Sequence, residues 1–126
     1  MVIKESAEMY LETILVLSKK GAVRSIDIAK EMNFSRPSVS VALHSLEKEE
    51  YISIEEDQSI KLLPKGAEIA KAIYERHTIL TQFFEQIGVK SSIAAADACK
   101  IEHDISPESF KAIKKIVKNN LKSEKK

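Results

Sequence analysis

Three residues whose side chains can bind a transition metal stand close together late in the chain: Cys99, Glu102 and His103. In a helix their spacing of i, i+3 and i+4 places them on one patch of the surface. A thiolate, a carboxylate and an imidazole together favour a first-row transition ion. His77 supplies a further nitrogen if the helix that carries it packs alongside. The sequence therefore predicts a candidate metal site.

Two more candidates, Met9 and Glu12, lie roughly opposite the apolar stripe of an N-terminal helix. Taken singly, each candidate ligand also has a purely structural explanation. A lone Met is commonly core filler, a lone Cys a small buried hydrophobe, and His77 falls on the apolar stripe of its own helix. The three histidines form no nucleophile–base set and no Gly-rich phosphate loop is present, so nothing in the sequence argues for an enzyme.

The elements that must position these residues follow from apolar spacing. Helical periodicity predicts six helices, over residues 5–20, 25–32, 35–50, 64–87, 91–105 and from 106 onward. Ser25, Ser35 and Ser91 or Ser92 are predicted N-caps, Pro37 fits a first turn, and Gly88 is a predicted C-cap. Alternation over 51–54 and again over 60–63 predicts a hairpin. The Lys-rich tail from Asn119 is predicted to be frayed.

Three helices followed by a two-stranded wing are typical of a winged helix-turn-helix, whose third helix reads the major groove of DNA. Arg36 is able to bind guanine or phosphate bidentately, Val41 suits a thymine methyl, and small hydroxyls allow close approach. The predicted DNA-binding residues are Ser35, Arg36, Pro37, Ser38, Ser40, Val41 and, on the wing, Lys61 and Lys65. The residues from Ser35 to Val41 fit the solvated start of a capped helix about equally well, and Lys61 and Lys65 fit ordinary solvated lysines at least as well.

Composition adds limits. The 126 residues carry 20 Lys+Arg against 19 Asp+Glu, so any basic surface must be local and a single copy should bind DNA weakly. A two-fold dimer reading half-sites about 34–36 Å apart would compensate. The predicted dimer surface is Ile79, Leu80, Phe83 and Phe84, with an intrachain core as the competing explanation.

One cysteine excludes an internal disulfide and fits the cytoplasm, and no apolar run or leader pattern predicts a membrane or secreted protein.

Four segments together resemble one family: residues 6–12, 26–29, the pair Arg76 and His77, and residues 99–103. They are similar to the diphtheria toxin repressor family of metal-dependent bacterial repressors, and the resemblance extends over residues 4 to 116. It implies a mainly α-helical, cytoplasmic homodimer that represses metal-uptake genes from palindromic operators in double-stranded DNA. The implied domains are a winged helix over 1–64 and a helical metal-binding and dimerisation domain over 65–126, and the Lys-rich composition adds the expectation of a flexible tail.

The resemblance divides the metal ligands between two branches of the family. The iron branch uses a Met, Cys, Glu and His set that matches Met9, Cys99, Glu102 and His103. Its ancillary site matches at His77, but Thr81 and Ala95 replace two ligands. The manganese branch matches at Glu12, His77, Glu102 and His103, while Met9 and Cys99 replace its Asp and Glu. One ion or two therefore stays open.

Ligand softness selects the metal, because thioether and thiolate suit Fe²⁺ better than Mn²⁺. We therefore expect Fe²⁺ first and Mn²⁺ next, with Co²⁺, Ni²⁺ and Zn²⁺ also binding in vitro. Two alternatives remain at this stage. One is a winged-helix redox sensor in which the Cys99 thiolate is oxidised. The other is a helical interaction module that binds no DNA.

Overall fold

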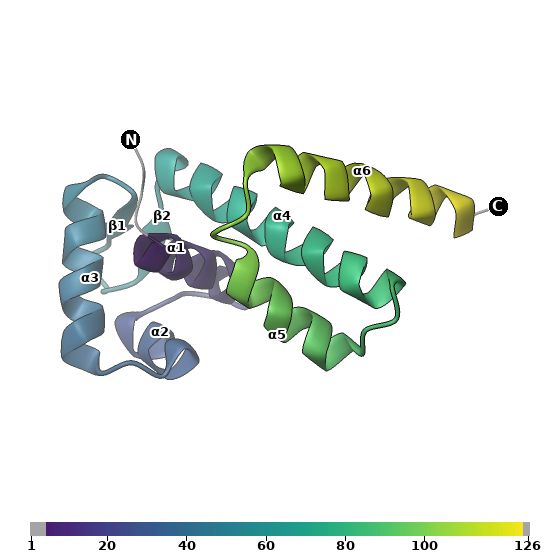
Figure 1. Ribbon diagram of the computed structural model, residues 1–126. Helices are drawn as coiled ribbons and strands as arrows, with labels where there is room; N and C mark the ends of the chain where they lie inside the picture. Colours follow the sequence, from purple (N-terminus) through teal and green to yellow (C-terminus); the bar gives the residue numbers. More distant parts are fainter. Residues whose placement is uncertain (1–4, 125–126) are drawn as a thin grey trace. The chain divides into compact units, whose positions relative to one another are not determined.

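Six helices and one hairpin make up the part of the chain described by a computed structural model, residues 5–124, with side chains to Leu121 (Figure 1). The elements are α1 (Glu5–Ser18), α2 (Ser25–Met32), α3 (Arg36–Lys48), β1 (Ile52–Ile54), β2 (Ile60–Leu62), α4 (Pro64–Gln86), α5 (Ser91–Ile101) and α6 (Pro107–Glu124). They form two compact units, Met1–Ala72 (unit 1) and Ile73–Lys126 (unit 2), and α4 contributes to both. The predicted class, a winged helix followed by a helical domain, is confirmed.

Unit 1 is held together by the apolar face of α1. Its Leu11 and Ile14 have no exposed surface, and neither do Ile28 of α2 and Val39 of α3. Full burial of such a side chain contributes about 1.5–3 kcal/mol relative to leaving it in water. The helical spacing of these residues therefore determines which faces of α1, α2 and α3 meet.

Capping residues at the starts of α2 and α3 fix where the two helices of the helix-turn-helix begin. Ser35 caps α3, since its Oγ accepts a hydrogen bond from the Ser38 amide at 3.3 Å, and Pro37 lies in the first turn as predicted. The predicted cap of α2 is wrong by one residue. Arg24 occupies that position, and its amide donates to Asp27 Oδ2 at 2.9 Å. Asn33 ends α2 in the left-handed conformation, with φ of 57°.

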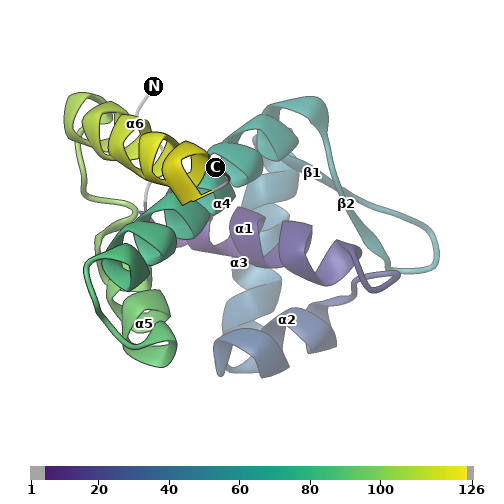
Figure 2. The same cartoon turned by 90° about the vertical axis from the view of Figure 1, so that its right-hand side faces the viewer.

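The hairpin forms the wing of unit 1. Its antiparallel strands pair Ile52 with Leu62 and Ile54 with Ile60. The Ile60 amide also donates to the carbonyl of Val23 at 2.7 Å, which ties the base of the wing to the segment before α2. Figure 2 shows the hairpin extending beyond the helices of unit 1.

In unit 2 the second half of α4, α5 and α6 run alternately in opposite directions (Figure 1). Gly88, with φ of 102°, follows the end of α4 as predicted. Among the described residues of unit 2, the buried apolar side chains are Ile73, Ile79, Leu80, Ala94, Ala98 and Val117. This packing brings the end of α5 beside α4, where the candidate metal ligands lie.

Several predicted helix ends differ from those observed. α5 ends at Ile101 rather than 105, since a turn through residues 102–104 follows. The cap expected at Ser91 or Ser92 is instead Lys90. α6 continues past Asn119 to Glu124, and Asn120 Nδ2 donates to Gln86 Oε1 at 2.9 Å, while the frayed tail stays a prediction. Lys125 and Lys126 lie outside the described residues.

Candidate metal centre and DNA-binding surface

His77 and Glu102 form the centre of the candidate metal site in unit 2. His77 Nδ1 on α4 lies 2.8 Å from Glu102 Oε2, which follows α5 directly. The Glu102 side chain is only 1 % exposed, and that of His77 is 31 % exposed. A carboxylate buried to this degree requires a proton, a cation or strong hydrogen bonds. The imidazole of His77 is a hydrogen-bond partner of this carboxyl group in the structure.

His103 completes the group from the other side. Its Nε2 lies 3.3 Å from Glu102 Oε1, and its side chain is 2 % exposed. Glu102 keeps helical φ and ψ of −60° and −28°, and the amides of Asp104 and Ile105 both donate to the carbonyl of Ile101. This turn directs two successive side chains into the protein. Two imidazoles around one carboxylate are a donor set that fits a divalent first-row ion.

The other predicted ligands are placed differently. Cys99 is exposed on α5, one turn before the buried pair Glu102 and His103. Met9 and Glu12 are partly buried on α1 in unit 1. Thr81, at a position that the resemblance assigns to an ancillary ligand, uses its hydroxyl to donate to the carbonyl of His77 at 2.7 Å. The roles of Cys99, Met9 and Glu12 as ligands stay predictions.

The start of α3 presents the predicted DNA-binding residues to solvent. Ser35, Arg36, Pro37, Ser38 and Ser40 are all exposed, and Val41 is 73 % exposed. The buried residues of the same helix, Val39 and Leu43, fix which face remains available. The Ser35 hydroxyl donates to Ser38 Oγ at 2.9 Å, so part of this polar surface is already ordered.

His44 is a residue of this surface that the sequence reasoning missed. It is exposed on α3, and its Nδ1 lies 2.7 Å from the carbonyl oxygen of Ser40. A carbonyl only accepts, so this hydrogen bond places a proton on Nδ1. The i, i+4 spacing of Arg36, Ser40 and His44 along one helix face is the signal that would have identified it.

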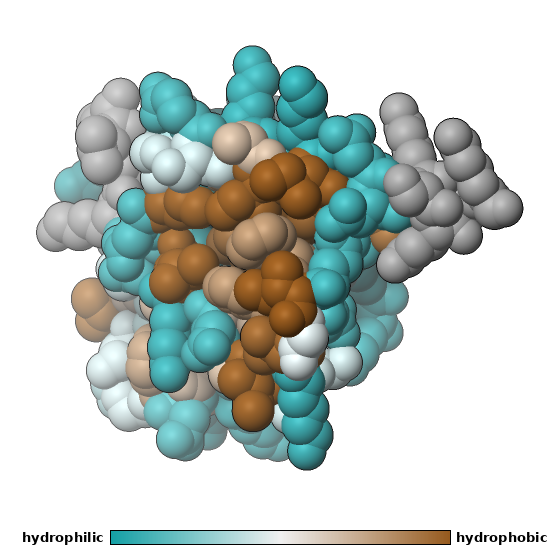
Figure 3. All heavy atoms as spheres, turned by 45° about the vertical axis from the view of Figure 1, so that its right-hand side comes forward, coloured by the Kyte–Doolittle hydropathy of each residue, from teal (hydrophilic) through white to brown (hydrophobic). Residues whose placement is uncertain are grey.

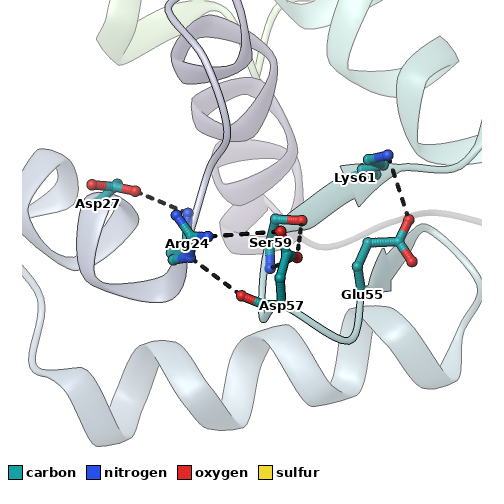
Figure 4. A network of polar contacts seen from close by, with 6 residues as sticks. All are labelled: Arg24, Asp27, Glu55, Asp57, Ser59 and Lys61. Carbon is teal, nitrogen blue, oxygen red and sulfur yellow. Dashed lines mark hydrogen bonds and ion pairs between the residues drawn. The ribbon is translucent and has the colours of Figure 1, made fainter.

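Of the two lysines predicted on the wing, Lys61 is on β2 (Figure 4), whereas Lys65 lies in the first turn of α4. Lys61 Nζ lies 3.8 Å from Glu55 Oε1, although the lysine side chain is 69 % exposed. Lys65 donates to the carbonyl of Glu49 at 3.1 Å and lies over the ring of Tyr51. The two lysines therefore have intramolecular partners with which DNA phosphates would compete.

Arg24 and Asp57 link the start of α2 to the wing (Figure 4). Arg24 Nε donates to the carbonyl of Asp57 at 3.3 Å, and its Nη2 lies 3.7 Å from Asp57 Oδ2. The hydroxyl and amide of Ser59 both donate to Asp57 Oδ1, at 2.6 and 3.0 Å. These Ser59 hydrogen bonds, with the Arg24 charge, hold the pKa of Asp57 below its ordinary value of 3.8.

The four residues of the predicted dimer surface differ in how far they are buried. Leu80 has no exposed surface and Ile79 is 8 % exposed, whereas Phe83 and Phe84 are partly exposed and contact each other. Exposed apolar side chains in unit 2 are Ile87, Ile93, Ile101 and Ile116. Figure 3 shows apolar residues gathered in a band on the face that it presents. None of the described helices is long and apolar enough to cross a membrane.

Two family models match consecutive parts of the chain. The iron dependent repressor N-terminal DNA binding domain matches residues 3–60, and the iron dependent repressor metal binding and dimerisation domain matches residues 63–124. A curated relative, the HTH-type transcriptional regulator MntR of Listeria welshimeri, is 37 % identical over 113 residues, which cover 89 % of this chain and 80 % of the relative. The MntR of Geobacillus kaustophilus is 36 % identical over 102 residues, covering 80 % and 72 %.

Solved structures share the fold. The metal-dependent transcriptional regulator MtsR superposes with a TM-score of 0.81 at 22 % identity, over 89 % of this chain and 53 % of MtsR. The manganese regulator SloR gives a TM-score of 0.77 at 24 % identity, with the same coverage of 89 % and 53 %. The chain thus spans about half the length of these two proteins. Because the family models match both parts of the chain, it belongs to the iron-dependent repressor family, the family of the diphtheria toxin repressor.

Proposed function

We propose that this chain represses genes of metal uptake, and that a divalent transition metal bound at His77, Glu102 and His103 activates it. Membership of the family makes the chain a metal-responsive, DNA-binding transcriptional regulator. The observation that carries the proposed site is the carboxylate of Glu102, buried between two imidazoles. Each of these groups is a first-row metal ligand when deprotonated.

The effector we propose is Fe²⁺, with Mn²⁺ as the competing ion. The preference depends on Met9 and Cys99, whose thioether and thiolate favour the softer ion, and Glu12 is proposed as an additional carboxylate ligand. If only carboxylate and imidazole ligands bind, Mn²⁺ becomes as suitable as Fe²⁺. SloR, one of the similar solved structures, is named as a manganese regulator, so the choice between Fe²⁺ and Mn²⁺ is the part of the proposal that most needs a test.

Titration of the metal-free protein, under anaerobic conditions, with Fe²⁺ and separately with Mn²⁺ tests this choice. We expect tighter binding of Fe²⁺, and we expect Cys99→Ser and Met9→Leu each to weaken Fe²⁺ more than Mn²⁺. Met32→Leu, a change of the same kind at a partly buried methionine of α2, is the matched control. Equal affinity for both ions, unaltered in the two variants, would show that Met9 and Cys99 are not ligands.

Metal activates DNA binding only if it binds the DNA-competent arrangement more tightly than the other arrangements of the protein. We propose that the competent form is a homodimer whose two α3 helices read half-sites about 34–36 Å apart in a palindromic operator. DNA must then raise metal affinity by the same factor as metal raises DNA affinity, and a coupling of ~1–3 kcal/mol is typical.

Selection of bound sequences from random double-stranded DNA, with and without Fe²⁺ or Mn²⁺, tests the function itself. A palindromic sequence enriched only with metal, and bound with an affinity that falls as salt rises, is the expected outcome. No enrichment under any condition would leave the helical interaction module as the better account.

The redox alternative gains no support from the comparisons, whose named relatives include metal regulators. DNA binding that responds to peroxide but not to chelators would restore it.

A further inference from the structure

Arg76, the residue before His77 on α4, contacts the backbone of the turn that carries the metal ligands. Its Nη1 donates to the carbonyl oxygen of Glu102 at 3.1 Å and to that of Ile105 at 2.8 Å. Its guanidinium also lies over the ring of Phe110 on α6, 5.4 Å from the ring centre. One partly buried cation thus joins α4, the turn after α5 and α6 within unit 2.

The position of this cation is favourable for two reasons. Glu102 is the C-cap of α5, where carbonyls lack amide partners within the helix and the helix end carries partial negative charge, whereas the Ile105 carbonyl lies beyond the helix, after the turn. A guanidinium satisfies both needs, since it is always charged and each terminal nitrogen carries two hydrogens that can point at different acceptors. The contact with Phe110 adds a cation–π interaction that a compact ammonium makes less well.

Arg76 and His77 contact different parts of Glu102. Arg76 binds the backbone oxygen of Glu102, and His77 Nδ1 lies 2.8 Å from the side-chain oxygen Oε2. The guanidinium therefore fixes the position of the residue while the carboxylate stays available to the imidazoles or to a metal. An arginine bound to the carboxylate itself would instead compete with the ion.

We propose that Arg76 is a positioning residue for metal binding: it holds residues 102–105 in the turn that directs Glu102 and His103 into the site before any metal is present. This inference rests on the metal site proposed above. It concerns a residue to which sequence reasoning gave no role beyond its place in the family resemblance. Residues that orient metal ligands in this way typically contribute 10- to 100-fold to metal affinity.

Arg76→Met and Arg76→Lys test the role of Arg76, with Lys114→Met as the matched control. Lys114 also bridges α4 and α6, through an ion pair of 3.1 Å with Glu75, but Glu75 does not lie in the turn. The measurements are Mn²⁺ affinity by titration and, in metal-free protein, hydrogen exchange of the amides of Asp104 and Ile105. Thermal unfolding of each variant measures the loss of global stability.

We expect Arg76→Met to weaken Mn²⁺ binding by roughly 10- to 100-fold. Exchange at Asp104 and Ile105 should become about tenfold faster or more, because hydrogen bonds from a charged donor are lost. Arg76→Lys should restore part of the Mn²⁺ affinity and part of the protection from exchange. Lys114→Met should change neither quantity, although its melting temperature should be similar to that of Arg76→Met.

Two outcomes would overturn the role of Arg76. One is unaltered Mn²⁺ affinity in Arg76→Met; the other is a loss that Lys114→Met reproduces at equal loss of stability. A wild-type protein that binds no metal would instead contradict the proposed function. The exchange measurement, which needs no metal, separates that failure from a failure of the positioning role.

Discussion

His77 Nδ1 and Glu102 Oε2 lie 2.8 Å apart, although the two residues are 25 positions apart in the sequence. The contact joins α4 to the end of α5 within unit 2 and places an ionisable pair where Glu102 is almost completely buried. A pair held mainly for stability could be replaced by apolar residues at little cost or even with gain. The metal site proposed above would give the pair, next to His103, a functional reason.

Replacing Arg36 by Ala should weaken binding to the selected operator by about 1–3 kcal/mol, because a bidentate contact to guanine or phosphate is lost. Stability should hardly change, since Arg36 is exposed. Fluorescence anisotropy at fixed salt measures the affinity. Lys48→Ala removes the same charge from the last turn of α3 and is the control. Equal losses in the two variants would mean that Arg36 contributes only through charge.

The Asp57 carboxylate should titrate below its ordinary pKa of 3.8 in the folded protein, and Ser59→Ala should raise that pKa towards 3.8. A lowered pKa stabilises the folded state above the ordinary value, and this stabilisation is lost as pH falls through the folded value. The difference in unfolding free energy between wild type and Asp57→Asn should therefore be constant near neutral pH and shrink below pH 3.8. Carboxyl NMR signals followed during acid titration give the pKa directly, and an unshifted Asp57 would contradict the geometry of the wing.

Gly66 should not tolerate even the smallest side chain. A β-carbon added there would overlap the carbonyl oxygen of Tyr51, which accepts a hydrogen bond from the Leu63 amide at 3.0 Å and so cannot easily move. Gly66→Ala should destabilise the protein by ~1–3 kcal/mol, despite the better helix propensity of alanine. Denaturant unfolding measures the loss. Lys71→Ala, at an exposed site of the same helix, should have little effect.

The sequence predicts the order of elements well because local signals specify them. Apolar periodicity, Ser35 with Pro37, and Gly88 mark helix faces and ends within a few residues. Long-range contacts specify what the sequence misses. The early end of α5 coincides with the hydrogen bonds from Arg76, more than twenty positions away, and α6 extends past Asn119 where Asn120 binds Gln86.

In the candidate site, too, local signals could be predicted and long-range contacts could not. Glu102 and His103 are adjacent in the sequence, so their proximity could be predicted. Whether His77 contributes depends on how α4 packs, and the sequence alone could not show this packing. It could not reveal that Cys99, predicted on the same patch, is exposed while Glu102 is buried. That difference depends on where the helix stops and on which residues pack against the turn.

We propose above that Glu102 binds the metal that activates DNA binding. The most direct test is the operator affinity of wild type and Glu102→Gln, each measured with and without Fe²⁺ or Mn²⁺ at one salt concentration. Glu108→Gln, an exposed change of the same kind in unit 2, is the control. We expect metal to raise the operator affinity of wild type and of Glu108→Gln by roughly 5- to 150-fold and to leave that of Glu102→Gln unchanged. A full metal response in Glu102→Gln would contradict this proposal.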